Sequence, residues 1–84
     1  MKIPNHLLEE NVAVKASTRK QVNFLYALMY PGKSPRSSWY RYSINTVVYL
    51  GEACYGNLSY AELKGHTLHP FEAVLSKPLI RRKV

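Results

Sequence analysis

The sequence predicts a mainly α-helical fold, a small bundle of short helices that forms one basic domain over residues 1–84. Three observations favour it. The chain of 84 residues has the length of a single domain, and its composition, 46% hydrophobic and 20% charged, is that of a folded protein. Two capping-box spacings precede apolar residues. Prolines and single glycines divide the chain into short elements.

The first third of the chain contains two expected helical segments. Residues 5–11 are predicted to form one or two turns, capped by Asn5, with Leu7 and Leu8 on the buried side. A longer helix is predicted from about 18 to 30, because Gln21 follows Thr18 at the capping-box spacing. Its apolar residues recur at helical intervals at Val22, Leu25, Leu28 and Met29.

Proline and glycine at 31–32 end that helix, and a basic, serine-containing loop follows at 33–38. Residues 35–50 fit two structures. Ser34 and Pro35 resemble a cap followed by proline at the first helical position. The alternating apolar and polar residues, many of them β-branched or aromatic, equally suit a strand. We favour the helix, because no partner strand of similar quality occurs elsewhere. The alternative is an α+β fold with a strand at about 39–50.

Two further short helices are predicted near the C-terminus. Ser59 and Glu62 form the second capping box, which predicts a helix at about 60–64 that ends at Gly65. Another helix is expected to begin at Pro70. Its inward-facing residues are Phe71, Val74 and Leu75, and Pro78 ends it. A flexible basic tail is predicted at 79–84.

These two short helices have the approximate size of a helix-turn-helix, whose second helix reads base edges in a groove. The second helix begins with Pro70, Phe71 and Glu72, none of which gives the bidentate base contacts made by Arg, Asn or Gln. We therefore expect ordinary helix packing here, without sequence-specific readout.

The charge of the chain points to a polyanionic partner. The chain contains twelve Lys and Arg but only five Asp and Glu, which gives a net charge of +7. In residues 36–42, positively charged and aromatic side chains are interspersed. Arginine neutralises phosphate, and aromatic rings offer faces on which bases stack. The alternative is that these cations are simply solvated and the rings belong to the core. The candidate site comprises Arg19, Lys20, Lys33, Arg36, Trp39, Tyr40, Arg41, Arg81, Arg82 and Lys83.

No residue pattern indicates catalysis. No histidine and acid are spaced from Cys54 as a nucleophilic site requires. We therefore expect Cys54 to be a small, buried hydrophobic residue. His66 and His69 have the spacing of two metal ligands, but the sequence offers no further ligands near them. We therefore expect them to be turn residues whose side chains hydrogen-bond to backbone groups. We expect no enzyme activity, cofactor, metal, small-molecule substrate or membrane segment. A lone cysteine and the absence of a signal-peptide core favour an intact, cytoplasmic protein.

The function predicted from these observations is non-catalytic DNA or RNA binding by a small accessory or regulatory protein. The alternative is a phage-type modulator or inhibitor that docks on an acidic or nucleic-acid-handling host protein, since interfaces favour Tyr, Trp and Arg. A subunit of a ribonucleoprotein is a third possibility. In residue type, though with longer spacing, the C-terminal stretch resembles small helical modules of some phage-encoded proteins at Gly65, Thr67, Glu72, Ala73 and Pro78. No site is transferred from that resemblance, which favours a viral or mobile-element origin.

Overall fold

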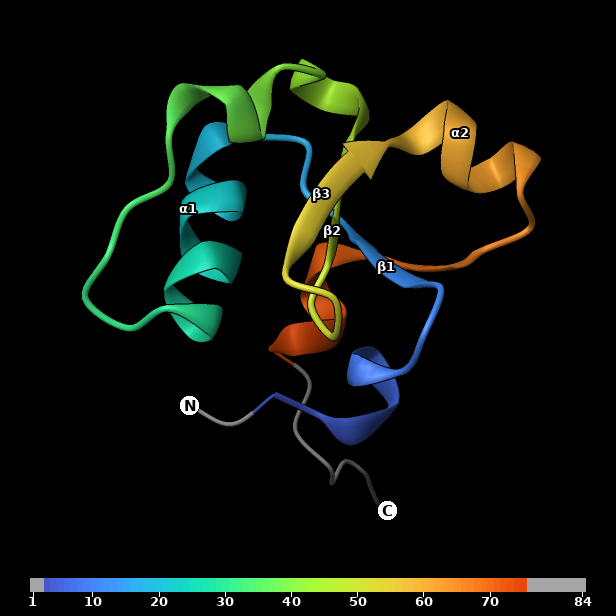
Figure 1. Ribbon diagram of the computed structural model, residues 1–84, viewed down its shortest axis with the longest axis horizontal. Coiled ribbons are helices and arrows are strands. Elements are labelled where there is room, and N and C mark those ends of the chain that lie inside the picture. The colour runs from blue at the N-terminus through green and yellow to red at the C-terminus, as the bar shows by residue number, and fades with distance from the viewer. Residues whose placement is uncertain (1–2, 76–84) are drawn as a thin grey trace, which may run out of the picture.

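A four-stranded mixed sheet organises the chain in the computed structural model, which describes residues 3–75 (Figure 1). The strands are β1 (Val12–Lys15), β2 (Thr46–Tyr49), β3 (Cys54–Asn57) and β4 (Thr67–His69). The α-helices are α1 (Arg19–Met29) and α2 (Leu58–Leu63). Four 3₁₀ segments connect them: η1 (Asn5–Leu8), η2 (Ser37–Tyr40), η3 (Ser43–Asn45) and η4 (Phe71–Val74).

The strand order across the sheet is β3-β2-β1-β4. Strands β2 and β3 form an antiparallel hairpin, with Val47 opposite Gly56. Strand β1 lies antiparallel to β2 but parallel to β4, where Val12 is opposite Thr67. A parallel pair needs a long connection, and here the whole middle of the chain provides it.

The two faces of the sheet bury different sets of side chains, because successive residues of a strand point to opposite faces. On one face, Val14 and Val48 pack with Val22 and Leu25 of α1. On the other face, Ala13, Val47 and Tyr49 pack with Ala61 of α2. In Figure 1, α1 and α2 accordingly lie at opposite ends of the view with the sheet between them.

The helix predicted at about 18–30 is confirmed, and Thr18 and Gln21 cap its N-terminus. The hydroxyl of Thr18 accepts a hydrogen bond from the backbone N–H of Gln21, at 3.1 Å. The side chain of Gln21 accepts one from the backbone N–H of Ser17, at 2.9 Å. Val22 and Leu25 are buried, as the helical spacing predicted.

The prediction of a mainly α-helical bundle is wrong, because α1 is the only α-helix within residues 3–75 that is longer than the six residues of α2. Residues 39–50 are not a helix. Two 3₁₀ turns lead into β2, so the strand alternative was correct for Thr46–Tyr49. Partner strands do exist on both sides, but each is short, and β3 contains glycine and asparagine. Pairing and burial outweigh their low strand propensity.

Other local predictions need smaller corrections. The segment predicted at 5–11 is the 3₁₀ turn η1, without a side-chain cap from Asn5, and Leu8 is exposed. Helix α2 begins at Leu58, two residues before the predicted start at about 60. Its cap is Asn57, whose side-chain oxygen accepts a hydrogen bond from the backbone N–H of Ser59. The residue expected to be buried, Cys54, is exposed.

The linker between the two short helices also differs from the expectation. Residues 67–69 form β4, and the segment after Pro70 is the 3₁₀ turn η4, in which Val74 is buried while the adjacent Leu75 is exposed. A strand in this position leaves no helix-turn-helix. The tail predicted at 79–84 and the stop at Pro78 lie outside the described residues. No helix within residues 3–75 is long and apolar enough to cross a membrane.

Candidate nucleic-acid interface

Five aromatic side chains form a continuous array, which we call the ring cluster: Tyr26, Tyr30, Trp39, Tyr42 and Tyr55. The ring of Tyr26 lies 4.9 Å from that of Tyr30 and 5.0 Å from that of Trp39, measured between centroids. Trp39 lies 5.0 Å from Tyr55, which in turn lies 6.2 Å from Tyr42. These separations are typical of interacting aromatic pairs.

Three elements far apart in the sequence bring these rings together. Tyr26 lies on α1, and Tyr30, four residues later, is the C-cap residue whose backbone N–H donates to the carbonyl oxygen of Tyr26, so their rings lie side by side. The turn η2 contributes Trp39, and strand β3 contributes Tyr55. The green η2 segment crosses above α1 toward the end of β3 in Figure 1. Trp39 is half-buried and packs against the core, so it serves both the fold and the surface array.

The structure joins the predicted cations at the start of α1 to those around η2. The guanidinium of Arg19 lies over the ring of Tyr40, 5.5 Å from its centroid. The hydroxyl of Tyr40 donates a hydrogen bond to the carbonyl oxygen of Ser17, at 2.8 Å. Arg36 and Arg41 flank η2 at its two ends, and both are exposed. Tyr40 is therefore an anchor between the two elements.

Not every predicted cation belongs to this group. Lys20 adjoins Arg19 in the first turn of α1, whereas Lys33 follows the other end of the helix, about 15 Å away along its axis. The remaining candidates, Arg81, Arg82 and Lys83, lie outside the described residues.

The segment that carries four of the five rings of the ring cluster, all but Tyr55, is strongly segregated in charge. Residues 11–51 contain no Asp or Glu, although they include the whole of α1, η2 and η3. Its cations are Lys15, Arg19, Lys20, Lys33, Arg36 and Arg41. A one-sign field of this kind attracts and steers a polyanion.

A pocket of about 450 Å³, which we call the tyrosine pocket, adjoins the ring cluster and shares two of its residues. Strands β2 and β3, their connecting turn and α2 provide most of its walls. The residues that line it are Tyr42, Tyr49, Glu52, Cys54, Tyr55, Gly56, Asn57, Tyr60 and His66.

The back of this pocket is held in place by a buried tyrosine. The hydroxyl of Tyr49 and Nδ1 of His66 are 2.9 Å apart and hydrogen-bonded. Burial, followed by the nearby Cys54 and Glu52, raises the pKa of Tyr49, so its hydroxyl stays neutral. Gly56 makes room for the ring, because a Cβ at that position would lie 3.1 Å from a ring carbon of Tyr49.

No protein-family model, characterised protein or solved structure matches this chain. What the surface can bind must therefore be argued from its own residues. Within residues 3–75, no three His, Cys, Asp or Glu side chains gather as metal ligands would. The two predicted turn histidines make ring contacts instead: His66 with Tyr49, and His69 with His6 at 5.3 Å.

The exposed thiol in the tyrosine pocket provides a chemical probe of its surroundings. Partial burial of the group and the carboxylate of Glu52 raise the pKa of Cys54. We expect iodoacetamide to alkylate Cys54 in the folded protein, but more slowly at pH 8 than in the urea-unfolded chain, because less thiolate is present. Glu52→Gln should lower the pKa and raise the rate, measured by mass spectrometry. Glu62→Gln is the matched control, and an equal rate increase there would contradict the assignment.

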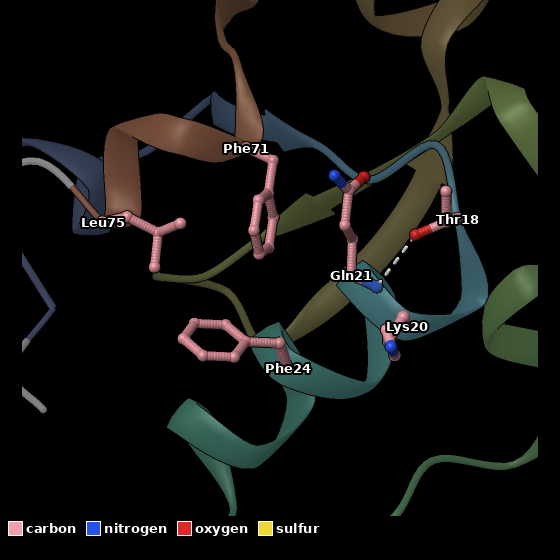
Figure 2. Close-up of a pocket in the computed structure, with 6 residues that line it drawn as sticks. All are labelled: Thr18, Lys20, Gln21, Phe24, Phe71 and Leu75. Carbon is pink, nitrogen blue, oxygen red and sulfur yellow. Dashed lines mark hydrogen bonds between the residues drawn. The ribbon is translucent and has the colours of Figure 1, made fainter.

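A second hollow, of about 350 Å³, lies between the start of α1 and η4 (Figure 2). The rings of Phe24 and Phe71 form part of its wall and contact each other edge to face, 5.5 Å apart between centroids. The other lining residues are Thr18, Lys20, Gln21 and Leu75. The polar atoms of Thr18 and Gln21 are engaged in capping α1. This hollow therefore offers few groups to orient a ligand, and we place the candidate interface at the ring cluster.

Sequence reasoning found the cations around η2 but missed most of the rings. The spacing of Tyr26 and Tyr30 on a correctly predicted helix could have revealed their shared face. Tyr55 gave no such signal, because its neighbours are set by the pairing of β3 with β2. Lys64 was also missed; its ammonium group lies 5.7 Å from the ring centroid of Tyr60.

Proposed function

We propose that the protein is a non-catalytic accessory or regulatory protein that binds nucleic acid by its phosphate backbone. The observation that carries the proposal is the acid-free segment 11–51, in which Arg36 and Arg41 flank the turn that contributes Trp39 to the ring cluster. Arg19 lies over the ring of Tyr40 in the same turn. Cytoplasmic location is part of the proposal, since the single cysteine suits a reducing compartment.

In the proposed mechanism, arginine side chains bind the phosphates and aromatic rings add contact area. Arginine side chains displace counterions from the phosphates and form charge-assisted hydrogen bonds with their oxygens. These contacts position the backbone without reading its sequence. Rings at the edge of the cluster, such as the exposed Tyr30, add contact area beside the backbone. Binding of this type weakens steeply as the salt concentration rises.

We expect Arg36→Ala with Arg41→Ala to reduce affinity for a labelled single-stranded oligonucleotide roughly tenfold or more at 0.1 M salt. The slope of log K against log salt should fall by about 1.4, because two phosphate contacts are lost at about 0.7 each. Fluorescence anisotropy at several salt concentrations measures both quantities.

The charge-matched control is Lys15→Ala with Lys33→Ala, which removes two cations away from η2. Lys15 lines a separate hollow with Pro70 and Phe71, and Lys33 lies beyond the end of α1. A change in slope equal to that of the arginine pair would show that net charge alone acts. Complete absence of binding by the wild-type protein at low salt would remove the proposal.

Two exposed apolar side chains favour a second candidate function, docking on a host nucleic-acid-handling protein as a modulator or inhibitor. Ile44 is 70% exposed and Leu63 is 82% exposed. Both side chains lie outside the buried core, where they can contact a partner. Pull-down from nuclease-treated lysate, comparing the wild type with Ile44→Ser and Leu63→Ser, tests this function. A partner retained by both variants would argue against it.

A further inference from the structure

The tyrosine pocket has the volume and the aromatic lining of a site for a small planar ligand. Its volume of about 450 Å³ lies in the usual range for small-ligand sites, about 300–1,000 Å³. Four tyrosine rings and one imidazole line it. The inner wall is fixed, since Tyr49 is bonded to His66. The outer wall is open, since Tyr60 is 53% exposed. A planar group could therefore enter from solvent and find aromatic surface already in place.

The polar groups of the pocket discriminate between the parts of a nucleotide. Glu52 places a carboxylate in the lining, which repels a phosphate. Its Oε2 accepts a hydrogen bond from the backbone N–H of Asn11, at 3.3 Å, and its other oxygen can accept one from the amino group of a base. The side-chain oxygen of Asn57 is occupied by the N–H of Ser59, at 2.8 Å, so the amide NH₂ is the group it can offer as a donor. Lys64, beside the ring of Tyr60, supplies a cation for phosphate at the rim.

The pocket is continuous with the proposed backbone-binding surface. Tyr42 and Tyr55 belong to both the pocket and the ring cluster, and Arg41 immediately precedes Tyr42. A strand held by phosphate contacts around η2 would thus pass the pocket mouth. In a duplex, base faces are covered by stacking on their neighbours, so only an unpaired base is free to enter.

We infer that the tyrosine pocket takes up an unstacked nucleobase and makes the protein selective for single-stranded nucleic acid. This inference rests on the proposed nucleic-acid-binding function and adds the form of nucleic acid bound. Base stacking on an aromatic ring contributes about 1–3 kcal/mol per base, which corresponds to a roughly 5- to 150-fold change in affinity.

The test compares a labelled oligodeoxycytidine dodecamer with its duplex formed on oligodeoxyguanosine, at one salt concentration. The wild-type protein should bind the single strand at least about tenfold more tightly than the duplex. Tyr60→Ala should lower single-strand affinity roughly tenfold and leave duplex affinity unchanged, whereas Tyr60→Phe, which keeps the ring, should retain it. Leu63→Ala is the control, because Leu63 lies on the same helix as Tyr60 and is 82% exposed but does not line the pocket. It should lose less than about threefold.

Circular dichroism melts establish that each variant is folded before its affinity is compared. Equal binding of single strand and duplex by the wild type overturns the inference and leaves the proposed function standing. The inference also fails if Tyr60→Ala binds like the wild type, or if Leu63→Ala loses as much affinity as Tyr60→Ala. Binding of neither ligand overturns the inference and the proposed function together.

Discussion

Leu25→Ala is expected to destabilise the protein by about 2–5 kcal/mol, the usual cost of truncating a large buried aliphatic side chain. Leu25 is fully buried between α1 and the sheet, where the neighbours Val14, Val22 and Val48 can only partly close the space left behind. In a domain of this length the melting temperature should fall by at least about 10 °C. Thermal unfolding followed by circular dichroism measures it.

The control for this substitution is the same change at a solvent-exposed leucine. Leu63 lies on α2 and is 82% exposed, so Leu63→Ala should alter stability by no more than about 0.5 kcal/mol. Comparable losses at Leu25 and Leu63 would contradict the packing of α1 against the sheet.

Gly51→Ala is expected to cost about 1–3 kcal/mol, the range for forcing an extra carbon into a packed site. Gly51 follows β2 at the start of the turn to β3. A Cβ there would lie 2.0 Å from the carbonyl oxygen of Leu8, so η1 or the turn must move. Chemical denaturation with urea gives the difference in free energy of unfolding.

Gly32→Ala separates that steric effect from loss of glycine's backbone freedom. Gly32 has φ of 81°, but a Cβ there meets nothing within 4 Å. Its replacement should cost about 1 kcal/mol, from the left-handed conformation alone. If Gly51→Ala were as stable as the wild type, the close contact between η1 and the turn would be refuted.

The parts of the fold that sequence reasoning predicted correctly are those set by local interactions. Helix α1 is specified within its own residues, by the cap at Thr18 and by apolar spacing. The strands are not specified locally. β3 includes Gly56 and Asn57, which have little strand propensity, and it is a strand because β2 lies beside it. Judging the segment at 39–50 by the apparent lack of partners therefore gave the wrong fold class.

The candidate site likewise has one part that follows from the local sequence and another that depends on strand pairing. The proximity of Arg36, Trp39 and Arg41 follows from their closeness in the sequence, and the capping of α1 brings Arg19 near them through Tyr40. The tyrosine pocket requires knowing that β2 pairs with β3 and that α2 follows directly. No pattern within a short window contains that information.

The parallel pairing of β1 with β4 has a consequence for how the chain is made. Val12 and Thr67 are more than fifty residues apart, and the backbone N–H of Thr67 donates to the carbonyl oxygen of Asn11. A growing chain on the ribosome cannot complete the sheet until residues 67–69 have left the exit tunnel. Until then one edge of β1 stays unpaired, and such edges readily recruit other chains. The nascent segment that carries β1 is therefore exposed to association with other chains for as long as the middle of the chain is being made.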